Sequence, residues 1–305
     1  MLYPPPLKKG DTIAVIGISG LVREEEGKIR EQIISKVEKM GLKAKIHPSV
    51  YRQHGYFSGT DSQRAQAFMD AFLDKDVQGV FCVKGGYGVM RILDKIDYAA
   101  IREHPKVFVG YSDITAVHTA IQNECKMVTF HGPMLTSSKE ETGYTCEALW
   151  QSVSAKKPLG EMKNPKGERL ESFAPGIAKG RLTGGNLTLL THTLGTPYEI
   201  DTKGKILFLE EVDEEVYCID RMLTHLALAG KLKECEGIIL GGFTNCEMEN
   251  STGLTLKNVF EELLLPLKKP VVSSLAAGHV SKQLTLVLGG EHILDGNKGT
   301  LSWEK

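Results

Sequence analysis

Residues 106–122 read Lys-Val-Phe-Val-Gly-Tyr-Ser-Asp-Ile-Thr-Ala-Val-His-Thr-Ala-Ile-Gln and contain the junction around which the chain is organised. The apolar run 107–109 predicts a buried strand, and apolar residues three to four apart from Ile114 to Ile121 predict a helix. Ser112 lies where the strand ends and the helix begins. We expect its hydroxyl to project from the edge of a sheet, close to the unpaired N–H groups of the helix N-terminus. Those features suit a nucleophile and the oxyanion that its attack creates.

Ser112 also has a purely structural interpretation. Serine and aspartate are both favoured as N-cap residues, so Ser112 or Asp113 would serve simply to begin the helix. The Gly-x-Ser-x-Gly pattern of a nucleophile elbow is incomplete, because Ile114 stands in place of the last glycine. This stretch alone leaves both interpretations open.

Apolar segments that alternate with helical patterns predict a doubly wound, mostly parallel sheet in the first half of the chain. The predicted strands are 12–17, 43–47, 77–83, 107–109 and 127–130. Lys84-Gly-Gly-Tyr-Gly88 follows one of them directly. Its glycines permit positive φ and a close backbone approach to a ligand, or they form only a turn. Because ligands of such sheets bind at the carboxyl ends of the strands, we expect Gly85 and Gly86 to lie near Ser112.

The second half of the chain predicts a smaller α/β domain with a mixed sheet. A buried strand at 205–209 ends at Glu210, and His279 follows a later strand. We expect a tight turn at 184–186, and antiparallel strands at 284–288 and at the C-terminus. The predicted organisation is a first domain at 1–155, a linker with several prolines and lysines at 156–176, and a second domain at 177–305.

Composition and charge exclude several classes of protein. The formal net charge of the 305 residues is −1, so no overall field attracts nucleic acid or an anionic membrane. No apolar run approaches the roughly 18 residues of a membrane span, and we see no apolar core of a signal peptide. The six cysteines form no C-x-x-C pair, which indicates reduced thiols in the cytoplasm rather than disulfides or a zinc site. We therefore expect a cytoplasmic protein with neither a nucleic-acid nor a membrane partner.

Ser112, Glu210 and His279 each follow a predicted strand, and together they have the chemistry of a serine hydrolase. A hydroxyl needs a base within hydrogen-bond reach, and the base needs an orienting partner, roles that imidazole and carboxylate fill. Each residue also has a structural alternative, since His279 is one of nine histidines and Glu210 is one of several acids at 210–215. Chain order does not decide between them, because triads occur in several orders.

Six short motifs occur in order along nearly the whole chain. They are Lys84-Gly-Gly-Tyr-Gly88, Gly110-Tyr-Ser-Asp113, His131-Gly-Pro133, Leu182-Thr-Gly-Gly-Asn-Leu187, Phe208-Leu-Glu-Glu-Val212 with Glu214 and Ile219-Asp-Arg-Met222, and Gly278-His279. Together they resemble the LD-carboxypeptidases of the S66 serine peptidases, a group that also includes the microcin C immunity proteins. The resemblance implies a two-domain fold with the nucleophile in the first half of the chain.

The resemblance also implies roles for the motif residues. Ser112 would be the nucleophile, His279 the general base and Glu210 the acid that orients it. Backbone N–H groups of Asp113 and of the Gly85–Gly86 loop would form the oxyanion hole. The substrate would be a cytosolic murein tetrapeptide, cut at its L,D-peptide bond to release D-alanine during cell-wall recycling. The family further implies a homodimer and a reaction that needs no metal and no organic cofactor.

Four further motif residues are candidate contacts of the peptide: Lys84, Tyr87, Asn186 and Arg221. Lys84 or Arg221 would neutralise the terminal carboxylate, although each is also explained as an ordinary surface cation, and Tyr87 as a packing residue. The family usually has arginine at the position of Lys84. Lysine keeps the charge but lacks the planar fork that grips a carboxylate at two points. The loop 17–20 also departs from the family's usual Ala-Pro-Ser turn.

Two alternative functions remain open. One is the same chemistry on an aminoacyl-nucleotide amide, as in the microcin C immunity proteins. That branch lacks the Gly-Gly-Tyr-Gly loop, which this chain keeps. The other is a non-catalytic binding module for a nucleotide or small metabolite, but the loop has neither Gly-x-Gly-x-x-Gly nor Walker A spacing. The favoured prediction is an L,D-carboxypeptidase.

Overall fold

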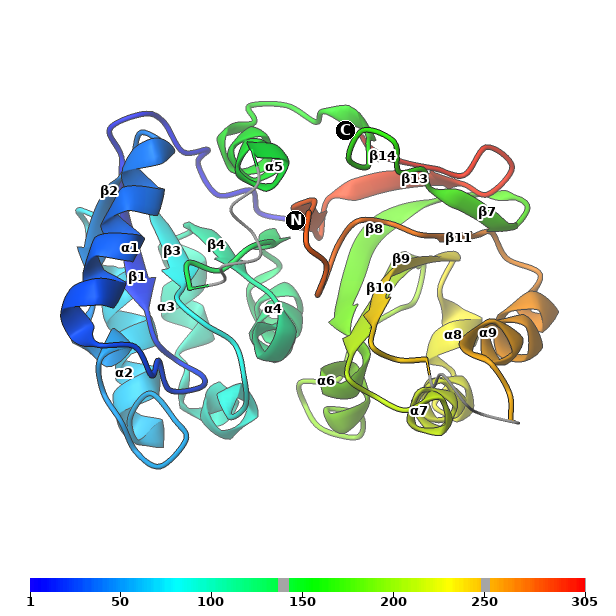
Figure 1. Cartoon of the computed structure of the whole chain (residues 1–305), viewed down its shortest axis with the longest axis horizontal. Helices are drawn as coiled ribbons and strands as arrows, with labels where there is room; N and C mark the ends of the chain where they lie inside the picture. The colour runs from blue at the N-terminus through cyan, green and yellow to red at the C-terminus, as the bar shows by residue number, and fades with distance from the viewer. Residues whose placement is uncertain (137–142, 248–252, 305) are drawn as a thin grey trace. The chain divides into compact units, whose positions relative to one another are not determined.

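Residues 1–136, 143–247 and 253–304 are described by a computed structural model, and the chain divides into two units (Figure 1). Unit 1 consists of Met1–Lys156 with Thr285–Val287, and unit 2 consists of Lys157–Leu284 with Leu288–Lys305. None of the described helices is both long and apolar enough to cross a membrane.

Unit 1 is built on a six-stranded sheet with the order β12-β5-β4-β3-β1-β2. The strands are β1 Thr12–Ile16, β2 Lys43–Ile46, β3 Gly79–Cys82, β4 Val107–Gly110, β5 Thr129–His131 and β12 Leu286–Leu288. The pairs from β2 through β5 are all parallel. β1, β3 and β4 are almost wholly buried, as expected for apolar strands covered on both faces.

Helices alternate with the strands of unit 1. They are α1 Glu26–Lys39, η1 Pro48–Val50, α2 Asp61–Leu73, η2 Val89–Lys95, α3 Tyr98–Glu103, η3 Ser112–Ile114, α4 Thr115–Ala120, η4 Ile121–Cys125 and α5 Gly143–Ser154, of which η4 is a π-helix and the other η elements are 3₁₀ turns. α1 packs on β2, α2 on β1 and α4 on β5. The N-cap of α2 is Thr60, whose capping box includes Gln63, and Asp61 is the first helical residue.

Unit 2 contains an eight-stranded mixed sheet with the order β6-β14-β13-β8-β9-β10-β11-β7. The strands are β6 Gly160–Met162, β7 Glu171–Ala174, β8 Ile177–Asn186, β9 Lys205–Val212, β10 Gly237–Thr244, β11 Val271–Ser273, β13 Glu291–Asp295 and β14 Thr300–Glu304. β8 to β11 pair in parallel and the remaining pairs are antiparallel. The helices are α6 Leu187–His192, α7 Val216–Leu228, α8 Lys231–Glu234, α9 Leu256–Leu264 and η6 Leu265–Leu267, and they share an apolar core with the sheet.

These two sheets confirm the predicted fold class, a mostly parallel N-terminal sheet followed by a C-terminal α/β unit with a mixed sheet. Three local predictions differ from the structure. Residues 156–176, expected to be a linker, include β6 and β7, the two edge strands of the sheet in unit 2. Edge strands tolerate charged residues, so they lack the apolar pattern by which central strands are recognised.

The other two differences concern glycines and strand pairing. Residues 184–186 continue β8 rather than forming a turn, and a Cβ atom on Gly184 would collide with the carbonyl of Phe208 in β9. The glycines therefore permit close strand approach. The alternating stretch 284–288 contains β12, which belongs to the sheet of unit 1 and not to the antiparallel part of unit 2. Alternation predicts a strand but not its partners.

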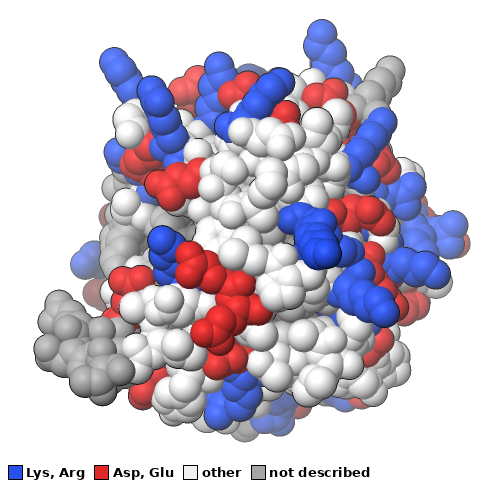
Figure 2. All heavy atoms as spheres, turned by 90° about the vertical axis from the view of Figure 1, so that its right-hand side faces the viewer, with Lys and Arg blue, Asp and Glu red and all other residues white. Residues whose placement is uncertain are grey.

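Charged side chains of both signs lie on the face shown in Figure 2. Lysine and arginine side chains lie among aspartate and glutamate side chains there, with uncharged surface between them. This distribution agrees with the formal net charge of −1. Among the described residues on this face, lysine and arginine form no extended, purely basic surface of the kind that binds nucleic acid.

Candidate active site

Ser112 begins the short helix η3 directly after β4, at the carboxyl edge of the sheet in unit 1. Its φ of +64° is left-handed, a conformation that costs an L-residue about 1–2 kcal/mol. The N-cap of η3 is Tyr111 and no side chain caps this helix, so neither Ser112 nor Asp113 has the capping role. Strained, partly exposed turn residues of this kind are typical of functional sites.

The glycine loop 84–88 packs against Ser112, as predicted from the order of the strands. A Cβ atom on Gly85 would lie 3.1 Å from Ser112 Cβ and 3.3 Å from Ser112 Oγ. Gly86 has φ of +123°, which other residues rarely adopt. The loop backbone therefore approaches the Ser112 hydroxyl at a place that a side chain would obstruct. The N–H of Asp113 lies in the first turn of η3, where N–H groups have no helical partner.

The carboxylate of Asp113 ties two neighbouring loops to the nucleophile turn. It accepts a hydrogen bond from Ser19 Oγ at 2.5 Å and another from the Val89 N–H at 3.0 Å. The residue is only 1% exposed. Burial raises the pKa of Asp113, although both hydrogen bonds favour its ionised form. The side chain thus positions the loop that contains Ser19 and the start of η2, a role that the sequence did not predict.

Arg64 is a fully buried arginine that binds the backbone of the same loops. Its Nη1 donates hydrogen bonds to the carbonyls of Ile18 and Gly88, both at 2.8 Å. Its Nη2 donates to Asp61 Oδ1 at 2.7 Å, and the guanidinium lies 4.6 Å from the centre of the Phe57 ring. An arginine in an amphipathic helix is normally solvated, so the sequence carried no signal for this role. Arg64 therefore fixes the end of the glycine loop at Gly88, and Asp113 fixes the next residue, Val89.

In unit 2, the carboxylate of Glu210 binds the imidazole of His279. Glu210 Oε2 lies 2.7 Å from His279 Nδ1 and accepts a hydrogen bond from the His279 backbone N–H at 3.2 Å. The Glu210 side chain is fully buried, whereas that of His279 is 20% exposed. Since the carboxylate contacts Nδ1, the ring nitrogen that would act as a base is Nε2. The predicted acid–base pair is thus in contact.

The backbone around His279 is shaped to allow this contact. Gly278 has φ of +96°, and a Cβ atom there would lie 2.7 Å from both Cβ and Cγ of Glu210. Gln283 Nε2 donates to the Gly278 carbonyl at 2.8 Å, and Thr244 Oγ1 donates to the His279 carbonyl at 2.7 Å. Glu210 itself lies inside β9 rather than after it, so the predicted strand ended too early. A run of acids at 210–215 obscured a strand that buries two of them.

Asn186 and Glu211 form a second buried polar pair in unit 2. Asn186 Nδ2 donates to Glu211 Oε1 at 2.7 Å, and Asn186 Oδ1 accepts from the Leu189 N–H as the N-cap of α6. Glu211 Oε2 also accepts a hydrogen bond from the Thr188 N–H at 2.8 Å. Burial raises the pKa of Glu211 above its usual value. The candidate substrate contact Asn186 is thus only 3% exposed and is bonded within unit 2.

The other candidate substrate contacts lie on the surface of their units. In unit 1, Lys84 Nζ donates to the Leu21 carbonyl at 3.2 Å, and the Tyr87 side chain is 56% exposed. Both flank the Gly85–Gly86 backbone. In unit 2, Arg221 is an exposed residue of α7 whose guanidinium lies 5.6 Å from the Tyr217 ring. Lys84 and Tyr87 are therefore next to the candidate oxyanion loop.

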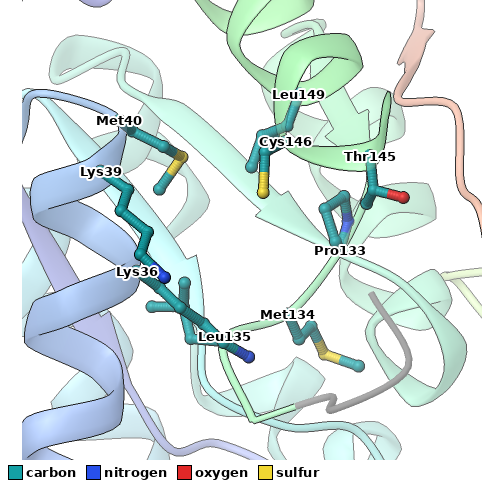
Figure 3. A pocket seen from close by; sticks show the side chains of 9 residues that line it. All are labelled: Lys36, Lys39, Met40, Pro133, Met134, Leu135, Thr145, Cys146 and Leu149. Atoms are coloured by element: carbon teal, nitrogen blue, oxygen red, sulfur yellow. The ribbon is translucent and has the colours of Figure 1, made fainter. Parts of the chain in front are cut away.

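A mostly apolar cavity of unit 1 lies between α1, α5 and residues 133–135 (Figure 3). Met134 lines it and also lies near the glycine loop, since its Cε would be 3.2 Å from a Cβ atom on Gly85. Its charged lining consists of Lys36 and Lys39. The described lining residues include the thiol of Cys146 but no histidine, aspartate or glutamate, so they do not form the acid–base pair that hydrolysis needs.

The described residues show no constellation for a metal. In the ranges 1–136, 143–247 and 253–304, no group of three or more His, Cys, Asp or Glu side chains could hold a metal ion. All six cysteines are free thiols.

Comparisons with known proteins match both halves of the chain. Residues 13–132 match the LD-carboxypeptidase N-terminal domain, and residues 179–294 match the LD-carboxypeptidase C-terminal domain. The probable murein peptide carboxypeptidase of Bacillus subtilis (strain 168) is 39% identical over 292 residues, or 94% of this chain and 90% of that protein. The crystal structure of muramoyltetrapeptide carboxypeptidase from Oxalobacter formigenes has a TM-score of 0.84 and 28% identity, covering 96% of this chain and 99% of that one.

A further relative is named for a different function. The Microcin C7 self-immunity protein MccF of Escherichia coli is 26% identical over 328 residues, covering 99% of this chain and 95% of that protein. The two domain matches together span most of the chain, and they follow the order of its two sheets. The chain belongs to the LD-carboxypeptidase family.

Proposed function

We propose that this protein is a serine carboxypeptidase that hydrolyses the L,D-peptide bond of murein tetrapeptides and releases the terminal D-alanine. Membership of the LD-carboxypeptidase family supports the reaction type, and a relative named as a murein peptide carboxypeptidase supports the substrate class. The observation that carries the proposal is the 2.7 Å contact between Glu210 and His279 Nδ1. A buried carboxylate that holds an imidazole in one tautomer is the supporting half of a hydrolytic triad.

The proposed nucleophile is Ser112. Its hydroxyl attacks the carbonyl carbon of the scissile bond, while His279 Nε2 takes the hydroxyl proton. The protonated imidazole then donates that proton to the nitrogen of the leaving D-alanine, and water hydrolyses the acyl ester by the same route in reverse. Glu210 keeps the Nδ1 proton in place and stabilises the imidazolium. In this mechanism the nucleophile comes from unit 1 and the base from unit 2.

The proposed oxyanion hole is formed by backbone N–H groups. The Gly85–Gly86 loop lies against Ser112, and the Asp113 N–H lies at the start of η3. Each such donor stabilises the transition state by about 3–4 kcal/mol when it is preorganised. The bonds from Arg64 and to the Asp113 carboxylate supply that preorganisation, because they leave the loop little freedom to move. No step requires a metal or an organic cofactor.

The remaining assignments are also part of the proposal. Lys84, Tyr87, Asn186 and Arg221 are proposed to contact the peptide, with Lys84 or Arg221 facing a carboxylate. A cytoplasmic location is supported by six free thiols, which suit a reducing compartment. The proposed homodimer rests on the family, and light scattering after gel filtration would measure it.

The test compares two substrates for the wild-type protein. We expect it to release D-alanine from L-Ala-D-Glu-meso-diaminopimelate-D-Ala, followed by mass spectrometry, and to leave an aminoacyl sulfamoyl adenosine uncut. The second substrate addresses the alternative function, which the 26% identity to the self-immunity protein supports. Cleavage of the nucleotide alone would establish that alternative. Binding without turnover of either compound would favour a non-catalytic module and contradict the proposal.

A further inference from the structure

An open pocket of unit 1 lies beside the glycine loop. Gly86 forms one side of it, and Lys84 and Tyr87 continue that side. Arg23 and Tyr56 come from two other loops and face the same space. The pocket therefore begins at the backbone that is proposed to bind the oxyanion. A group bound there would be attached to the substrate close to the scissile carbonyl.

The loops that form the pocket are joined by backbone hydrogen bonds. The Leu21 N–H donates to the Tyr56 carbonyl at 2.9 Å, and the Gly20 N–H donates to the Gly85 carbonyl at 3.1 Å. Lys84 Nζ donates to the Leu21 carbonyl. One donor of the Lys84 ammonium is thus used to hold the segment that leads to Arg23. The pocket is consequently built into the fold rather than formed by mobile side chains alone.

The lining has the chemistry of a carboxylate site. Its charged residues are Arg23 and Lys84, and none of the described lining residues is an aspartate or glutamate. The side chains of Tyr56 and Tyr87 are 60% and 56% exposed, with ring centres 6.0 Å apart. They offer apolar surface to the carbon chain that carries a carboxylate. Arg23 also supplies the planar, two-point fork that Lys84 lacks.

We propose that this pocket binds a carboxylate of the peptide, with Arg23 as a specificity-determining residue. The inference rests on the proposed function, because it takes the neighbouring Gly85–Gly86 backbone as the oxyanion loop. Two carboxylates of a diaminopimelate tetrapeptide lie close to the scissile bond: that of the terminal D-alanine and that at the end of the diaminopimelate side chain. Both present the same chemistry to Arg23, and substrate variants distinguish them.

The experiment measures binding and hydrolysis for the wild type, Arg23→Gln and a matched control, Arg102→Gln. Arg102 is an exposed residue near the end of α3, which precedes β4 and so lies at the opposite edge of the sheet from Ser112. Three peptides are compared: the diaminopimelate tetrapeptide, its lysine analogue without the side-chain carboxylate, and its C-terminal amide. Binding is measured by calorimetry in a Ser112→Ala background, so that it does not depend on turnover.

We expect Arg23→Gln to weaken binding of the full tetrapeptide at least about tenfold, as for loss of a charge-assisted hydrogen bond, and to raise KM with little change in kcat. For the one peptide that lacks the carboxylate bound by Arg23, Arg23→Gln and the wild type should bind with equal affinity. Arg102→Gln should bind all three peptides with wild-type affinity. Equal losses on all three peptides, or no loss, would overturn the inference. Absence of hydrolysis by the wild type would count against the proposed function alone, because the binding series would still decide the role of Arg23.

Discussion

Replacing Gly278 with alanine should disable the acid–base pair while leaving most of the fold intact. Gly278 has φ of +96°, and the new Cβ would lie 2.7 Å from Cβ and Cγ of Glu210 and would also overlap its Oε2. The backbone strain costs about 1–2 kcal/mol. The overlap must move either the His279 loop or the Glu210 side chain, and either shift breaks the 2.7 Å contact. We expect kcat to fall about 10²–10⁴-fold, as when an orienting carboxylate is lost.

Gly195 provides the matched control for backbone strain. It has φ of +76°, and a Cβ atom there would meet no other atom within 4 Å. Gly195→Ala should therefore lose similar stability in urea unfolding but keep the wild-type kcat for D-alanine release. Equal kcat values for Gly278→Ala and Gly195→Ala would refute this prediction, since the steric contact with Glu210 would then have no consequence for catalysis.

Two further predictions concern buried residues. Arg64→Met should destabilise unit 1 by about 3–5 kcal/mol in urea unfolding, because the carbonyls of Ile18 and Gly88 lose their shared hydrogen-bond donor. For the same reason it should lower kcat more than it changes KM. A destabilisation below about 1 kcal/mol would contradict this prediction. Burial lowers the pKa of His292 to about 4. Between pH 6.5 and 4 the unfolded chain therefore binds a proton that the folded protein does not. As the pH is lowered through this range, the free energy of unfolding should decrease by up to about 3 kcal/mol. His292→Gln should flatten this pH dependence, and an unchanged slope would count against it.

Local sequence patterns predicted the turn at Ser112 and the position of the glycine loop beside it. The apolar run before Ser112 and the helical spacing after it indicated the turn, and the order of the strands indicated that Gly85 would be its neighbour. Parallel strands place their carboxyl ends at one edge, so this inference needed no long-range contact information. The contact between Glu210 and His279 was predicted from chemistry and family resemblance rather than from spacing.

The sequence patterns did not predict contacts between segments that are distant along the chain. Arg64 bonds to carbonyls 46 and 24 residues away, and nothing in an amphipathic helix marks which arginine turns inward. The Asp113 carboxylate likewise binds Ser19, 94 residues away. Gly184 was interpreted as a turn because glycine marks both turns and close strand approaches, and only the neighbouring strand separates these cases.

The proposed mechanism depends on Ser112 as the nucleophile of an L,D-carboxypeptidase. The decisive measurement is the release of D-alanine from the diaminopimelate tetrapeptide by Ser112→Ala, with Ser35→Ala, a variant of an exposed serine of α1, as the control. We predict normal kcat/KM for Ser35→Ala and a loss of at least about 10³-fold for Ser112→Ala, with both variants folded. Release of D-alanine by Ser112→Ala at the wild-type rate would contradict it.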